Sequence, residues 1–134
     1  MKDLQETINN IDKIVSWWLE LKKGYSDISH LDEVNRKLSG YFYYLSEHVA
    51  DSNKDYLFAY VHKKVGLAKR EQRIIDDGGS ATLAKQTAPL HEEMLLMEEA
   101  QTEADFYALR LKLNAVAKVL EAIKQRISNL KKEL

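Results

Sequence analysis

The stretch that decides the fold is the C-terminal segment 106–134, which reads FYALRLKLNAVAKVLEAIKQRISNLKKEL. Its apolar residues recur at alternating steps of three and four residues without a miss. This is the heptad pattern of a helix that buries one continuous seam against other helices. The seam consists of Phe106, Leu109, Leu113, Val116, Leu120, Ile123, Ile127, Leu130 and Leu134.

Two upstream regions show the same helical spacing. The first covers about residues 3–23, and Gly24 supplies its stop signal. The second covers about residues 31–76, and Asp51-Ser52-Asn53 leaves open either one long helix or a kinked pair. Their apolar positions are Leu4, Ile8, Ile11, Val15 and Trp18 in the first, and Val34, Leu38, Tyr41, Leu45, Val49, Leu57, Val61, Val65 and Ala68 in the second.

The strongest turn signal in the chain is Asp76-Asp77-Gly78-Gly79-Ser80. Residues 80–88 could form one or two helical turns, and Pro89 is an acceptable first-turn residue for a third long helix. We therefore predict a single all-α domain of long helices in a helical hairpin or bundle. Its helices cover about 3–23, 31–76 and 89–134, with a turn at 77–80 and a coiled-coil-like helix at the C-terminus.

The predicted length of the third helix favours self-association over a compact monomeric bundle. A helix of about 45 residues spans nearly 70 Å at about 1.5 Å per residue. A compact domain of this chain length has a radius of gyration of only about 14 Å. We therefore expect a homo-oligomer whose subunit contact uses the seam from Phe106 to Leu130.

Composition excludes several classes of protein. Apolar residues make up 45% and charged residues 31% of the chain, with one proline and five glycines, which is too apolar for disorder. The absence of cysteine excludes a disulfide framework, a zinc–thiolate site and a thiol nucleophile. The formal net charge of −1 means that any nucleic-acid binding must come from a local patch.

Catalytic and metal-binding motifs find little support. The segment that begins at His91 lacks the second histidine of a zinc-protease motif, and Gly78-Gly79-Ser80 lacks the lysine and the preceding strand of a phosphate loop. His48 and Asp51 are one helical turn apart, but two such groups on a surface helix are typically just solvated. We expect no enzymatic activity, no metal and no cofactor.

The start of the chain is charged where a signal peptide would be apolar, and no apolar stretch approaches the ~20 residues of a membrane span. We therefore expect a cytoplasmic protein with no membrane partner.

Charge is strongly segregated along the chain. Five basic residues and one acidic residue lie between positions 62 and 73, whereas residues 92–105 carry six acidic residues and no basic one. On a helical wheel of about 100° per residue, most of these basic residues share one third of the circumference, and Val61, Val65 and Ala68 face away from them. We therefore expect a helix that is buried on the side of Val61, Val65 and Ala68 and presents a basic stripe on the other side. The basic stripe consists of Lys63, Lys64, Lys69, Arg70 and Arg73, with Tyr56 seven residues before Lys63.

Basic groups beside an aromatic ring suit single-stranded nucleic acid, because the charges follow phosphates and the ring can stack on a base. We therefore predict a DNA- or RNA-binding stripe. A solvated face, or a surface that pairs with the acidic segment of a neighbouring copy, remains the alternative. The aromatic pair Trp17-Trp18 and the run Tyr41–Tyr44 cannot lie on one helix face, so we expect core packing, with some rings at a subunit contact or available for binding.

Two segments resemble the UvsY-type recombination mediators of bacteriophages. One is Lys63–Arg70, KKVGLAKR, followed by the Gly78-Gly79 turn; the other is Leu120–Arg126, LEAIKQR. Chain length and the opening Asp3–Glu6 are also similar to the family. Ala68 departs from the pattern, since the family has a basic residue there, and Lys69 beside it could take over.

The resemblance implies a ring-like homo-oligomer of helical subunits that binds single-stranded DNA, helps to displace single-strand-binding protein and loads a RecA-like recombinase. In such a protein, the basic stripe would be the DNA surface, Arg70 would be its main residue, and the C-terminal helix would be the assembly element. The alternative is a phage coiled-coil scaffold or adaptor with no nucleic-acid role. If the protein is phage-encoded, the cytoplasm is that of the host cell.

Overall fold

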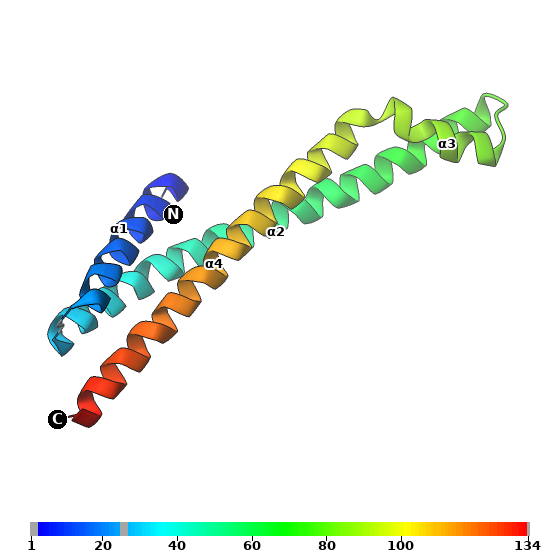
Figure 1. Cartoon of the computed structure of the whole chain (residues 1–134). Coiled ribbons are helices and arrows are strands. Elements are labelled where there is room, and N and C mark those ends of the chain that lie inside the picture. The colour runs from blue at the N-terminus through cyan, green and yellow to red at the C-terminus, as the bar shows by residue number, and fades with distance from the viewer. Residues whose placement is uncertain (1–2, 25–26, 134) are drawn as a thin grey trace. The chain divides into compact units, whose positions relative to one another are not determined.

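Four α-helices make up the computed structural model, which describes residues 3–24 and 27–133. Figure 1 shows them in chain order from blue to red. They are α1 (Leu4–Lys23), α2 (Ile28–Asp76), α3 (Ala81–His91) and α4 (Glu93–Glu133). The all-α class is confirmed, as is the packing of the two long helices, α2 and α4, in a helical hairpin.

The second helix, α2, is one uninterrupted helix of 49 residues that passes through Asp51-Ser52-Asn53 without a break. It begins at Ile28, earlier than the predicted start near Leu31. The reason is a cap: the carboxylate of Asp27 accepts a hydrogen bond from the backbone N–H of His30 at 2.8 Å, which satisfies a free donor of the first turn.

The glycine turn separates α2 from α3. Gly78 has a φ of 99°, a left-handed conformation that glycine adopts without a steric penalty. The hydroxyl of Ser80 then accepts a hydrogen bond from the backbone N–H of Leu83 at 3.1 Å, which caps the start of α3.

The last long helix begins at Glu93 and not near Pro89, which lies inside α3. Because Ser80 already starts a helix, Pro89 falls in the last turns of that helix and not in the first turn of the next. A proline at this position lacks an N–H donor and its ring crowds the preceding turn, so α3 ends soon afterwards. Glu92 leaves the helical conformation, with φ −122° and ψ 35°, and α4 follows.

Contacts between residues divide the chain into two compact units. Unit 1 comprises Met1–Ala50 and Leu109–Leu134, and unit 2 comprises Asp51–Ala108. Unit 1 therefore contains α1, the first part of α2 and the last part of α4. Unit 2 contains the rest of α2, α3 and the first part of α4.

The heptad seam forms the core of unit 1 within a single chain. Val116, Leu120, Ile123 and Ile127 are buried in one cluster with apolar side chains of α1 and α2. Leu109, Leu113 and Leu130 pack against that cluster, and Leu134 lies outside the described residues. The cluster members from α1 and α2 are Ile11, Trp18, Leu31, Val34, Leu38 and Leu45.

The length of the third helix predicts that another copy covers its apolar seam. The helix is long, but its seam is covered by the same chain's α1 and α2, since Ile123 is 0% and Leu120 only 7% exposed. These two side chains therefore have almost no exposed apolar area left to offer to another copy. Burial of these residues is thus accounted for within one chain, and the use of the seam as a subunit contact stays a prediction.

The aromatic runs divide between core and surface, as their spacing indicates. Trp18 is in the core of unit 1, and Tyr41 and Phe42 pack against that core. Tyr43 is 62% exposed, and its ring meets that of Tyr44 edge-on at 5.9 Å.

Across the described helices, none is long and apolar enough to cross a bilayer.

Candidate nucleic-acid interface

In unit 2, α2 and α4 face each other through charged residues as well as small and apolar ones, and no large apolar side chain there is fully buried. The basic run of α2 meets the acidic run of α4 in two ion pairs, Lys63–Glu99 in close contact and Arg70–Glu92 at 2.9 Å. The imidazole of His62 also lies 3.4 Å from the carboxylate of Glu98, a contact that is an ion pair only when the histidine is protonated. Pairing of the basic stripe with the acidic segment of a neighbouring copy is one alternative to nucleic-acid binding that the sequence leaves open. Such pairing is present here, but with the acidic segment of the same chain.

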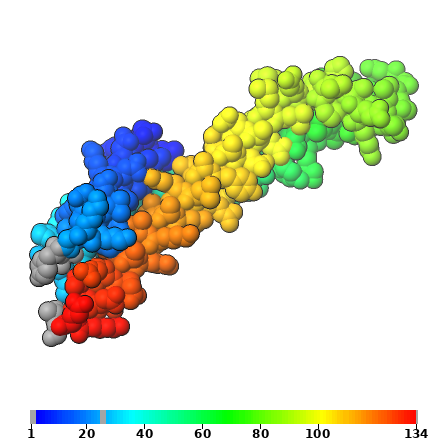
Figure 2. All heavy atoms as spheres, in the orientation of Figure 1, coloured from blue at the N-terminus to red at the C-terminus, as the bar shows by residue number. Residues whose placement is uncertain are grey.

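Small residues let the two helices approach. Ala59 is buried, and the side chain of Leu95 occupies the space that a Cβ on Gly66 would need. Packing of this kind together with the opposite charges turns the basic side of α2 toward α4. Figure 2 shows the atoms of α3 packed against the adjoining parts of α2 and α4, from green to yellow.

This orientation contradicts the prediction that Val61, Val65 and Ala68 are the buried side of α2. Val61 is 55% and Val65 is 46% exposed, and Ala68 is exposed as well. These three residues do lie opposite the basic stripe on the helical wheel, as predicted. The error was to assign the side of α2 that carries them to the interior. The acidic run of α4, far away in sequence, decides the orientation.

Two of the five cations of the stripe face α4. The side chain of Lys63 is 20% exposed and that of Arg70 is 28% exposed, and their partners Glu99 and Glu92 are similarly covered. A cation held this way must leave its carboxylate before it can contact a phosphate. Arg70, the residue that sequence and resemblance favoured most, is therefore not freely available.

Tyr56 is also used within unit 2. Its ring stacks on that of Phe106, with centroids 6.1 Å apart and planes at 20°, so Phe106 of the seam packs here. Partial burial first, and then the carboxylate of Glu103, raise the pKa of Tyr56 above its ordinary value of 10.0. The stacking closes one of the two faces of the Tyr56 ring to a base.

The other three cations of the stripe are exposed. Among the described residues, no carboxylate lies within 4.0 Å of the charged groups of Lys64, Lys69 or Arg73. On the helical wheel, however, Lys64 lies on one edge of the α2–α4 contact, and Lys69 and Arg73 lie on the other. One strand that follows α2 cannot run along both edges at once.

The edge that contains Lys69 and Arg73 also carries Lys54, Phe58 and His62, and we call these five residues the basic edge. The ring of Phe58 is 64% exposed, and the ammonium group of Lys54 lies 5.8 Å from its centroid. Exposed cations that follow a helix edge beside an open ring match what a single strand needs.

Sequence reasoning missed Phe58 and Lys54 because it looked for an aromatic residue at seven-residue spacing from Lys63. Spacings of three and four residues around each aromatic residue would have found Lys54 with Phe58. They would also have found Tyr60 on the opposite edge, where the ammonium groups of Lys63 and Lys64 each lie 5.2 Å from its ring centroid.

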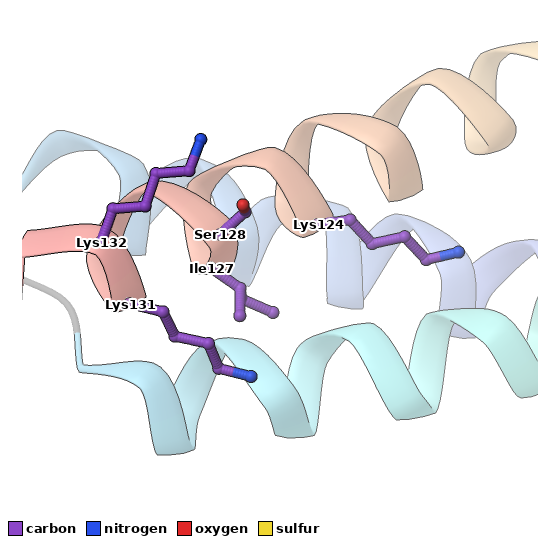
Figure 3. A pocket seen from close by; sticks show the side chains of 5 residues that line it. All are labelled: Lys124, Ile127, Ser128, Lys131 and Lys132. Atoms are coloured by element: carbon purple, nitrogen blue, oxygen red, sulfur yellow. The ribbon is translucent and has the colours of Figure 1, made fainter.

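A second basic surface lies on unit 1, at the end of α4. Lys124, Ile127, Ser128, Lys131 and Lys132 line a shallow hollow there, and Figure 3 shows Lys124 and Lys131 extending on the side where Ile127 points. The hollow offers cations but no aromatic ring among its lining residues. It therefore lacks the stacking element that the basic edge has.

Residues 3–24 and 27–133 contain no group of three or more His, Cys, Asp or Glu side chains that could hold a metal ion. Comparison with protein-family models, curated proteins and solved structures finds no match to this chain.

Proposed function

We propose that this protein binds single-stranded DNA along the basic edge of unit 2. The observation that carries the proposal is the pair Lys69 and Arg73, which lie one helical turn apart, are exposed and have no carboxylate partner among the described residues. Phe58 on the same edge supplies an open ring for a base. Binding of this kind depends strongly on salt and little on sequence.

The step from DNA binding to a biological role rests on the resemblance to the UvsY-type mediators. On that basis we propose a recombination mediator that works as a homo-oligomer in the cytoplasm and helps to load a RecA-like recombinase on DNA covered by single-strand-binding protein. An extended strand that lies across several copies would gain affinity from each, because linked weak contacts act together.

A second candidate function is a helical scaffold with no nucleic-acid role. It is favoured by the exposed apolar side chains of unit 2, where only Ala59, Ala84 and Ala88 are buried among the apolar residues. Large exposed apolar surfaces mark interaction sites. Under this interpretation the protein binds other protein surfaces only, and Lys69 and Arg73 are merely solvated.

The ion pair between Arg70 and Glu92 provides a test that can raise DNA binding. Glu92→Gln removes the carboxylate that holds the guanidinium, so Arg70 becomes free to contact a phosphate. We expect tighter binding of a labelled single-stranded oligonucleotide in fluorescence anisotropy. The slope of log K against log salt should steepen by about 0.7 for the one added contact.

Glu93→Gln is the matched control, since Glu93 is the next residue, is exposed and makes no ion pair among the described residues. Both changes remove the same charge, so a general electrostatic effect would appear equally in both. Equal effects of the two variants would show that Arg70 does not join the DNA contact.

A further inference from the structure

The outward face of α2 in unit 2 is apolar from Leu57 to Ile75 with one exception. Its residues recur at steps of three and four, and most are large and about half exposed, such as Leu57 at 52% and Val61 at 55%. Only Gln72 interrupts the pattern. The α2 outer stripe consists of Leu57, Val61, Val65, Ala68 and Ile75.

The outward face of α4 in unit 2 repeats this arrangement. Met94 is 78% and Met97 is 57% exposed, and the stripe continues through Ala104 and Ala108, which are exposed as well. Gln101 is the one polar residue at these steps. We call Met94, Met97, Ala104 and Ala108 the α4 outer stripe.

Each helix of unit 2 thus has a second apolar face outside the hairpin, besides the face that holds its ion-paired charges and packs against the other helix. On the wheel, each outer stripe lies nearly opposite the face that its helix turns to its partner in the hairpin. The two stripes therefore point away from each other. An amphipathic helix normally buries its apolar stripe, so both stripes need a cover.

We propose that copies of this chain associate head to tail, with the α2 outer stripe of one copy packed antiparallel on the α4 outer stripe of the next. A single kind of contact then covers both stripes in every copy. A two-fold contact between two α2 stripes would leave the α4 stripes exposed, and the reverse holds for α4. Contacts of the head-to-tail kind close into rings or continue as filaments.

The side chains of the two stripes fit in an antiparallel register. When Leu57 lies opposite Ala108 of the next copy, Val61 lies opposite Ala104 and Ala68 lies opposite Met97. Each of these pairs places a larger side chain against a smaller one, which lets the two surfaces interdigitate. The two glutamines, Gln72 and Gln101, fall among these positions without opposing each other.

Charge favours the same arrangement. In this register, Lys69 lies near Glu98 of the next copy, and only Glu71 meets a like charge, at Glu93. Lys63 and Arg70 are paired with Glu99 and Glu92 inside the hairpin, so the charges beside this contact are those that flank the stripes. Two-fold contacts would instead bring two basic runs or two acidic runs together, which costs free energy.

Paired stripe variants test the proposal. Val61→Asp with Val65→Asp disables the α2 stripe, and Met94→Asp with Met97→Asp disables the α4 stripe. Because these four positions are exposed in one chain, both proteins should keep the helix content of the wild type. Circular dichroism checks this, and light scattering after size exclusion measures the mass.

We expect the wild type to form assemblies of several copies and each variant alone to be a monomer. An equal mixture of the two variants should form a dimer of twice the monomer mass, because one intact stripe of each kind remains. A wild type that is monomeric at tens of micromolar overturns the proposal. So does a mixture that stays monomeric, or one variant that dimerises alone, which would indicate a two-fold contact.

Lys69 takes part in both proposals, because it lies on the basic edge and also near Glu98 of the next copy, but the two proposals can still fail separately. The Met94→Asp with Met97→Asp variant leaves all residues of α2 unchanged, and as a monomer it can be assayed with the same labelled oligonucleotide. Assembly without oligonucleotide binding would leave the head-to-tail contact in place and remove the proposed function.

Discussion

Replacement of Ile123 by aspartate should unfold unit 1. Ile123 is 0% exposed in the core formed by α1, α2 and α4. Loss of the side chain's packing alone costs about 2–5 kcal/mol, and the carboxylate adds the further cost of burying a charge without a partner. Domains have a total stability of only about 5–15 kcal/mol. Circular dichroism should therefore show a large loss of helix.

Ala122→Asp is the control, since Ala122 is the preceding residue and is exposed. It introduces the same charge and should cost no more than about 0.7 kcal/mol through helix propensity. The pair of variants also separates two roles of the seam. A folded, helical but monomeric Ile123→Asp protein would place the seam at a subunit contact and contradict its burial within one chain.

Reversal of charge on the basic edge should weaken DNA binding strongly. The double change Lys69→Glu with Arg73→Glu removes two phosphate contacts and puts two carboxylates in their place. We expect the affinity for a single-stranded oligonucleotide to fall by at least an order of magnitude, and the salt slope to flatten by about 1.4 for the two lost contacts. Both residues are exposed, so the helix content should not change.

Two controls locate the effect. Lys124→Glu with Lys131→Glu makes the same change of charge at the hollow on unit 1, and Lys64→Glu changes the opposite edge of α2. Each should leave most of the affinity in place. Loss of binding in the Lys124 and Lys131 variant alone would move the DNA contact to unit 1 and contradict the proposed site.

The core of unit 1 could be predicted well because its signal is local. Alternating steps of three and four residues mark the buried face of a helix whatever lies against it, and Val116, Leu120, Ile123 and Ile127 are indeed buried. The pattern does not say whether the neighbouring helix belongs to the same chain. That is why burial of the seam within one chain could not be separated from burial between copies.

The orientation of α2 in unit 2 could not be predicted from its own residues. An apolar stripe normally faces the interior, and Val61 and Val65 form such a stripe. Here the opposite side carries Lys63 and Arg70, whose partners Glu99 and Glu92 follow after a turn and a further helix. Ion pairs between segments that are distant in the sequence thus decide which side of α2 faces α4. The spacing of apolar residues within α2 carries no information about such pairs.

The start of α4 was misplaced for a similar reason. A proline is read as a first-turn residue only when no helix is already running, and Ser80 had started one. The cap signal at Ser80 was visible in the sequence, but the short segment before Pro89 was too weakly periodic to be assigned.

The most direct test of the proposed function is a salt series with the wild-type protein. Fluorescence anisotropy should be measured with single-stranded and double-stranded oligonucleotides of the same length and of several sequences. We expect binding to single strands with little sequence preference, and log K that falls linearly with log salt at about −0.7 per phosphate contacted. The absence of oligonucleotide binding even at low salt would contradict a role in DNA binding and leave the scaffold function.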